Sequence, residues 1–286
     1  MLLPVSTLAR NRLAHSRLAH TGAGRGLLTL RRSGKGTAVA QAFATSPLRL
    51  LMPRNHGDAA WVFFATLGGG LVDGDRVDVR VDAGEGTVAL IGTQASTKVY
   101  RSPRGCSQRV EVHAGEGAVL ALVPDPIVCF AGARYSQEIH VSLAPSASLL
   151  LLDGYTCGRA ARGERWQFAG FSSRTTIVRD GKTAIVDGTR LDPVHGSIAE
   201  RMGRFDVVLT LIALGPRFGP LREAMLAPRR APSPADATVV AASHVGVDAA
   251  IVRIAAERFE SASNALRPSF SALTRVLGDD PFARKW

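Results

Sequence analysis

Short segments of alternating apolar and polar residues recur through the first two thirds of the chain, separated by turns rich in Gly, Pro and Asp. The segment Val77–Val81 alternates apolar and charged residues with a period of two, as a strand with one buried face does. A turn, Ala83–Gly86, separates it from a more apolar segment, Thr87–Ile91. The pattern therefore predicts two different strands joined by a tight turn.

This unit of strand, turn and strand occurs three times. Its turns are Ala83–Gly86, Ala114–Gly117 and Ala144–Ala147, at steps of 31 and 30 residues. Each turn follows an alternating strand and precedes a more apolar one. Such spacing predicts units that stack and bury their apolar strands between two sheets. We therefore predict a mainly β fold of layered or stacked sheets, either β-solenoid-like or sandwich-like.

The rest of the chain predicts more strands and a few helices, mostly C-terminal. Pro220 is placed to begin a helix over Leu221–Ala227, and apolar residues at helical spacing from Phe259 to Leu277 predict another, which Pro268 should kink or split. The further predicted strands are Leu27–Leu30 with Thr37–Ala40 as an opening hairpin, Trp61–Phe64, Ser172–Val178, Thr183–Val186, Phe205–Leu214, and Thr238–Ala242 with Ala250–Ala255 as a second hairpin.

Composition shows that the chain folds and that its charge is unevenly placed. With 286 residues, 46% of them hydrophobic, it can bury a substantial core. The net charge is +11, but residues 1–57 hold nine Lys and Arg and no acid, which leaves 26 basic against 24 acidic residues in the remainder. We expect residues 1–26 to be a basic, flexible extension and 27–286 to form a single domain. The extension has the composition of an organellar transit peptide, or equally of a solvated tail.

Two further observations concern location. The sequence has no apolar run of the roughly 18 residues that cross a bilayer. Its three cysteines are odd in number and lack paired spacing, which argues against a disulfide framework. Both favour a protein of the reducing cytoplasm.

Acidic residues at the ends of apolar runs are the candidate site. Each forms a turn readily, which is the simpler interpretation. If the strands stack in register, however, their ends meet, and the carboxylates together with Cys129 and Cys157 would hold a divalent metal transiently. These residues are Asp73, Asp75, Asp125, Asp153 and Asp187.

Established catalytic and metal motifs are absent from the sequence. It contains no HExxH, CxxC or GxSxG, and neither glycine-rich stretch is followed by GK[ST]. A permanent metal site, a nucleophilic hydrolase and a P-loop nucleotide site are therefore not indicated.

Four longer motifs resemble the UreD family of urease accessory proteins, called UreH in some organisms. The resemblance runs from about Leu27 to Trp286, with the motifs in the family's order and spacing. The motifs are Gly69–Asp75 (GGLVDGD), Thr93–Arg101 (TQASTKVYR), Pro124–Tyr135 (PDPIVCFAGARY) and Gly158–Trp166 (GRAARGERW).

The resemblance implies a non-enzymatic scaffold or chaperone for urease maturation. Members of the family are expected to join the urease apoprotein to UreF and the GTPase UreG and to pass Ni²⁺ through an internal passage without holding it permanently. Asp73 departs from the family, which more often has glycine there. By position, the passage residues would be Asp75, Asp153, Asp187, Asp125 and Thr97, with Glu164 a weaker addition.

Two other functions are compatible with parts of the sequence. Residues 1–57 are basic enough for RNA binding, but Phe43 is their only aromatic residue, so stacking platforms are missing. A hydrolase using the strand-end carboxylates is the third possibility, although these residues are scattered along the chain. We expect neither nucleic acid nor membrane as a partner.

Overall fold

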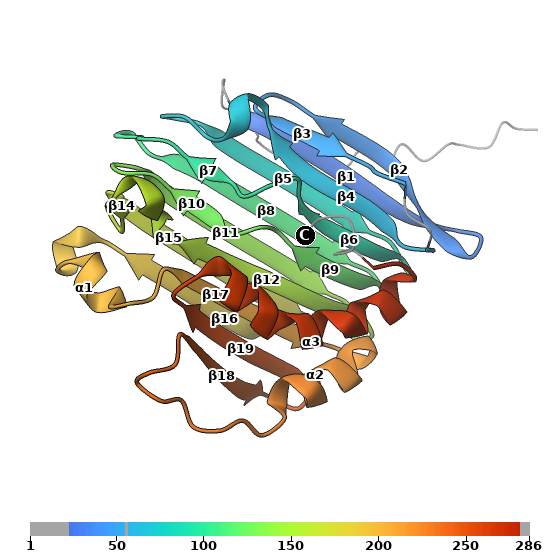
Figure 1. Ribbon diagram of the computed structural model, residues 1–286. Helices are drawn as coiled ribbons and strands as arrows, with labels where there is room; N and C mark the ends of the chain where they lie inside the picture. The colour runs from blue at the N-terminus through green and yellow to red at the C-terminus, as the bar shows by residue number, and fades with distance from the viewer. Residues whose placement is uncertain (1–22, 55–56, 281–286) are drawn as a thin grey trace, which may run out of the picture.

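Two β-sheets pack face to face in the computed structural model, which describes residues 23–54 and 57–280 (Figure 1). Sheet A has seven strands, and its central strands are parallel while both edge strands are antiparallel to their neighbours. Its strands, in spatial order, are β16 (Lys182–Leu191), β15 (Gly170–Arg179), β11 (Arg134–Leu143), β8 (Cys106–Ala114), β5 (Arg76–Ala83), β1 (Ala23–Ser33) and β2 (Gly36–Ala44).

Sheet B has ten strands and likewise combines a parallel centre with antiparallel flanks. Its main order is β18 (Thr238–Val245), β19 (Ala249–Ala256), β17 (Val207–Leu214), β12 (Ser148–Thr156), β9 (Val119–Val123), β6 (Val88–Thr93), β4 (Ala60–Thr66) and β3 (Leu48–Leu51). In addition, β10 (Ile127–Cys129) pairs with β12, and β7 (Lys98–Val99) pairs with β10. A small hairpin consists of β13 (Gly158–Arg159) and β14 (Glu164–Arg165).

The predicted repeat is the stacking unit of the two sheets. Each unit gives one strand to sheet A and the next strand to sheet B, as β5 and β6, β8 and β9, and β11 and β12. The register places Ala83 opposite Ala114 and Ala114 opposite Leu143, so the steps are 31 and 29 residues. The third predicted turn was therefore one residue out of register. In the third unit, the large residue Leu143 occupies the position equivalent to Ala114. The prediction instead aligned Ala144 with Ala114, because both are small.

Burial explains why the paired strands differ in sequence. One apolar core fills the space between the sheets, and a second lies between sheet B and two helices, α2 (Gly219–Leu226) and α3 (Phe259–Leu277). Figure 1 shows both helices lying across sheet B. Sheet B is thus covered on both faces and has continuous apolar strands, while sheet A has one exposed face and alternating strands.

Most predicted elements are confirmed, with differences at their ends. The two hairpins are β1–β2 and β18–β19. The last helix is not split, because α3 continues through Pro268. Strand β16 is longer than predicted, since its exposed face carries no apolar pattern beyond Val186. The short helix α1 (Ile198–Met202) was not predicted.

The N-terminal boundary differs from the one that composition suggested. Strand β1 begins at Ala23, so residues 23–26 belong to the body of the fold. A Cβ on Gly24 or Gly26 would lie 2.7 Å from a Pro47 side-chain atom or 2.6 Å from a Leu48 side-chain atom, which explains the glycines. The rest of the predicted extension, residues 1–22, lies outside the described residues.

The glycine cluster at Gly68–Gly70 allows the close backbone approach that its sequence predicts. A Cβ on Gly70 would lie 2.6 Å from the backbone oxygen of Lys98, and Leu71 pairs with Val99 of β7. Gly68 and Gly69 have φ values of +79° and +77°, which favour glycine. The cluster therefore fixes the loop before β5 against β7.

Candidate functional site: a polar cluster between the sheets

The inner faces of the sheets change from apolar to polar at the same level of the stack. In sheet B, register aligns Asp153 of β12 with Thr210 of β17 and Arg253 of β19. In sheet A, Gln137 of β11 aligns with Ser173 of β15. Because hydrogen bonds join the two sheets at this level, we call these residues the polar cluster: Gln137, Ser173, Thr175 and Asp187 from sheet A, and Asp153, Thr210 and Arg253 from sheet B.

Asp153 is the centre of the polar cluster. Its Oδ1 accepts a hydrogen bond from Gln137 Nε2 at 3.1 Å, and its Oδ2 accepts one from Ser173 Oγ at 2.6 Å. Burial raises the pKa of the Asp153 carboxyl; the two donors counteract this and the nearby charge of Asp187 adds to it. The carboxylate is thus held in place by two neutral donors, and it has no cationic partner of its own among the described residues.

Asp187 is the second carboxylate of the polar cluster. It forms an ion pair with the guanidinium of Arg253, so β16 of sheet A is joined to β19 of sheet B. Register places Asp187 beside Thr175, whose hydroxyl oxygen is buried without a hydrogen-bond partner among the described residues. Two carboxylates and an unsatisfied hydroxyl therefore lie near one another between the sheets.

Polar groups continue from Asp153 toward Thr97. The hydroxyl of Tyr135 lies 3.3 Å from the side-chain oxygens of both Gln137 and Gln108, and its single proton can serve one of them at a time. Gln108 in turn lines a cavity of about 150 Å³ together with Thr97. Contacts from Asp153 through Gln137, Tyr135 and Gln108 thus reach the cavity that Thr97 lines.

Asp125 lies near this cavity, in the loop between β9 and β10, and is hydrogen bonded to Thr93 at the end of β6. Thr93, which also lines the cavity, donates from Oγ1 to Asp125 Oδ2 at 3.1 Å, and Asp125 N donates back to Thr93 Oγ1 at 2.8 Å. This reciprocal pair is buried. Asp125 therefore positions the wall of the cavity.

The other acidic candidates lie in turns. Asp75 accepts a hydrogen bond from Val72 N at 2.8 Å within its turn. The carboxylate of Asp73 accepts hydrogen bonds from the backbone N and the Nε of Arg104, each at 2.8 Å. These hydrogen bonds hold the pKa of Asp73 below its usual value. For these two residues the structure shows the turn-forming role.

Glu164 likewise has a local structural partner. It pairs with Arg159, whose guanidinium lies 4.0 Å from the centre of the Phe130 ring, and it accepts a hydrogen bond from Ala131 N at 3.1 Å. The hydrogen bond from Arg159 is the main reason that the pKa of Glu164 is lowered. The contact stabilises the β13–β14 hairpin against the loop after β10.

The cysteines are poorly suited to bind a metal. All three are free and buried. Burial raises the pKa of Cys129 to about 12 and that of Cys157 to about 11, and it also raises the pKa of Cys106. The thiolate is the form that binds metals, so a raised pKa makes metal binding by these cysteines less favourable. Within residues 23–54 and 57–280, no three His, Cys, Asp or Glu side chains are grouped closely enough to hold an ion.

Several members of the polar cluster were not predicted from sequence. Gln137, Ser173 and Thr210 are ordinary polar residues within strands, and Arg253 is the only charge in β19. The available signal was the polar residue at an inner position of an apolar strand. Such residues can be recognised as one cluster only when the register between strands is known, and the sequence of a single strand does not determine that register.

Comparison with known proteins identifies the family. A family model described as "UreD urease accessory protein" matches residues 22–286. The chain is 50% identical to the urease accessory protein UreD of Sorangium cellulosum (strain So ce56) over 264 residues, covering 92% of this chain and 85% of that protein. It is 43% identical to UreD of Anaeromyxobacter sp. (strain Fw109-5), covering 92% and 89%, and 36% identical to the urease accessory protein D of Oryza sativa subsp. indica, covering 74% and 72%.

The family model extends over nearly the whole chain and includes both sheets and the polar cluster between them. Among the described residues, no helix is long and apolar enough to cross a membrane. The family match confirms the resemblance seen in the four sequence motifs. The chain belongs to the UreD family of urease accessory proteins.

Proposed function

We propose that this urease accessory protein delivers Ni²⁺ toward urease by way of the polar cluster. The observation that carries the proposal is the pair of carboxylates, Asp153 and Asp187, in a polar cluster within the mainly apolar core between the two sheets. Polar groups seldom occupy such an interior unless they are hydrogen bonded, and they cost stability there. The presence of these two carboxylates in the core, despite their cost in stability, is therefore consistent with a role in binding a cation.

The chemistry of the cluster suits a cation in transit. Its donors are carboxylate, amide and hydroxyl oxygens, which bind divalent first-row metals less tightly than thiolates or imidazoles do. Burial raises the pKa of the Cys129 and Cys157 thiols, so binding of an ion to either sulfur carries the added cost of removing its proton. A set of few, separated oxygen ligands favours transfer to a site with more ligands.

Protons and Arg253 compete with the cation. Because burial raises the pKa of Asp153, a proton competes with a cation for that carboxyl group over a wider range of pH than at an exposed aspartate. At Asp187 a cation competes with the Arg253 guanidinium. Both competitors weaken binding, and weak binding speeds release.

The partners we propose are the urease apoprotein, UreF and UreG, with this protein acting as a non-catalytic scaffold in the cytoplasm. Family membership supports a role in urease maturation, and the three free thiols suit a reducing compartment. RNA binding through residues 1–57 is not favoured. Within that segment, β1, β2 and β3 are integrated into the two sheets.

Complementation tests this function. In cells lacking this gene and grown with limiting nickel, the wild-type chain should restore urease activity and nickel content. Asp153→Ala and Asp187→Ala should restore much less, while still co-purifying with UreF. Unchanged urease nickel content after deletion of the gene would refute the role in delivery, and loss of the UreF complex in both variants would show that the carboxylates are structural.

A further inference from the structure

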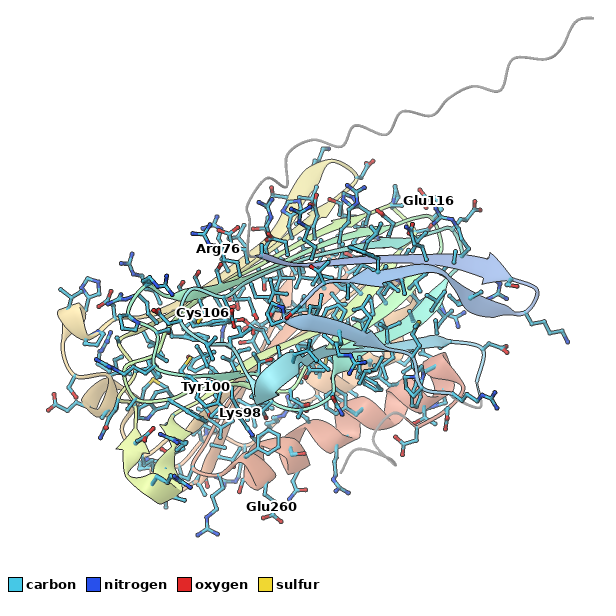
Figure 2. The ribbon with its side chains drawn as sticks, turned by 90° about the horizontal axis from the view of Figure 1, so that it is seen from above. Arg76, Lys98, Tyr100, Cys106, Glu116 and Glu260 are labelled. Carbon is cyan, nitrogen blue, oxygen red and sulfur yellow. The ribbon has the colours of Figure 1, made fainter. Side chains whose placement is uncertain are left out.

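We call the turns between the two strands of each repeat unit the stacking turns. A cationic groove lies on sheet A at the opposite ends of these strands. It has a volume of about 460 Å³. One register row crosses it on five neighbouring strands: Arg76, Ser107, Ser136, Ser172 and Arg190. Figure 2 shows Arg76 and Cys106 toward one end of the strands and Glu116 toward the other, with Glu260 of α3 on the far side of the molecule. The groove is therefore separate from the helix-covered face.

Two of the groove's arginines have no side-chain partner among the residues that the structure describes. Arg76 and Arg134 form no side-chain hydrogen bond or ion pair with any described residue, and both are exposed. Arg104, by contrast, is bound to Asp73, and Arg190 lies 3.6 Å from Asp192. The groove therefore has an excess of positive charge.

The neighbouring row on the same face has a different charge pattern. Two residues further along the strands, register aligns Asp78, Arg109, Glu138 and Arg174, so that acids and bases alternate from strand to strand. Opposite charges at directly paired positions stabilise a sheet and leave little net field. The row across the groove has only arginine and serine, which are all hydrogen-bond donors for an anion.

The length of the row indicates the shape of the ligand. Neighbouring strands are about 4.8 Å apart, so Arg76 and Arg190, four spacings apart, are separated by roughly 19 Å. A single phosphate spans only part of this distance, whereas an extended polyanion reaches both ends. The aromatic residues of the groove, Tyr135 and Phe171, are each only 2% exposed, so they offer no surface on which nucleic-acid bases could stack.

We propose that this groove binds an extended acidic segment of a partner protein, with carboxylates paired to Arg76 and Arg134 and hydrogen bonded by the serine row. Carboxylate binding by guanidinium is directional and is weakened by salt. The proposal rests on the proposed function only for the assumption that the partner belongs to urease maturation. Its binding chemistry stands on the groove alone.

A peptide-binding experiment tests the proposal with the full chain. The probe is a fluorescein-labelled peptide of alternating glutamate and glycine, about ten residues long, which extends to roughly 33 Å. Fluorescence anisotropy at low salt should show binding by the wild type. The Arg76→Ala/Arg134→Ala double variant should bind at least about tenfold more weakly. The matched control, Arg109→Ala/Arg174→Ala, removes two exposed arginines from the same sheet face and should change affinity less than about twofold.

The other results would overturn the proposal. They are no binding by the wild type, equal losses in both double variants, or stronger competition by inorganic phosphate or by a single-stranded RNA of similar length than by unlabelled peptide. The nickel-delivery proposal is tested separately, because the groove variants retain Asp153 and Asp187 and the carboxylate variants retain the groove.

Discussion

The two ends of the space between the sheets are built from the same strands but differ in chemistry. Near the stacking turns, the inner positions are apolar, as at Leu149 and Leu151 of β12 and Ile177 of β15. Toward the other end, the same two strands carry Asp153 and Ser173. The end near the turns therefore contributes mainly hydrophobic stabilisation, whereas the other end combines buried aromatic side chains of the same core with a hydrogen-bonded polar cluster.

This difference shows how a repeated architecture accommodates a specialised site. Strand register aligns residues at one level of each sheet, in antiparallel as well as parallel pairs, so polar residues at that level in several strands form a connected cluster. The substitutions in β12, β17 and β19 of sheet B meet those in β11, β15 and β16 of sheet A. Substitutions at the apolar end should therefore reduce stability more than activity, whereas substitutions in the polar cluster should reduce activity more than stability.

The largest loss of stability is expected at the apolar end. Leu151 is fully buried, and Leu151→Ala removes packed methyl groups and leaves a cavity. The free energy of unfolding should fall by about 2–5 kcal/mol. Urea denaturation followed by circular dichroism measures this value. A loss below about 1 kcal/mol would contradict the assignment of this end as the stabilising core.

A smaller loss of stability is expected when Asp153 is truncated. Asp153→Ala leaves the donors of Gln137 and Ser173 without their acceptor and should cost about 1–3 kcal/mol. Asp153→Asn retains the shape and an acceptor oxygen, so its stability should be close to that of the wild type. If both variants were equally destabilised, the charge of Asp153 would be part of the structural core, contrary to the comparison.

The pH dependence of stability isolates the charge of Asp153. Because its folded-state pKa is raised, the folded chain keeps a proton at pH values where the unfolded chain has lost it. Between the ordinary and the raised pKa, the free energy of unfolding therefore falls as the pH rises. Asp153→Asn should lack this contribution, so its stability relative to the wild type should increase from acidic to neutral pH. A constant difference in urea midpoints across that range would contradict the raised pKa.

The smallest change in stability is expected for Asp187→Asn. The side chain of Arg253 is 53% exposed, so loss of this ion pair should cost only about 0–1 kcal/mol. Removal of the Asp187 charge should also lower the pKa of Asp153, since that charge helps to raise it. Carboxyl titration by NMR in the variant and the wild type would measure the shift. An unchanged Asp153 pKa would show that the two carboxylates act independently.

The fold was largely predictable from sequence because its signals are local. Alternation within strands such as Val77–Val81 and the turns at Ala83–Gly86 and Ala114–Gly117 led to the stacked sheets. The third turn was placed one residue too far along, because Leu143 occupies a position held by alanine in the first two units. Register between strands depends on the packing of large residues, which the match of small residues does not capture.

The candidate site was predictable only in part. Asp153 and Asp187 were identified because each ends an apolar run, and the structure places them in one cluster. Asp75 shares that sequence signal, and its carboxylate accepts a hydrogen bond within its own turn. Gln137 and Arg253 have no distinctive motif, and their role depends on which residues face them across the two sheets.

The nickel content of urease tests the central claim most directly. Urease would be purified from cells that express either Asp153→Asn or the control Glu138→Gln, whose carboxylate is exposed on the outer face of β11 next to Gln137 in sequence. Metal analysis should show several-fold less nickel per urease with Asp153→Asn and a wild-type level with Glu138→Gln. Equal, wild-type nickel content in both preparations would contradict delivery through the polar cluster.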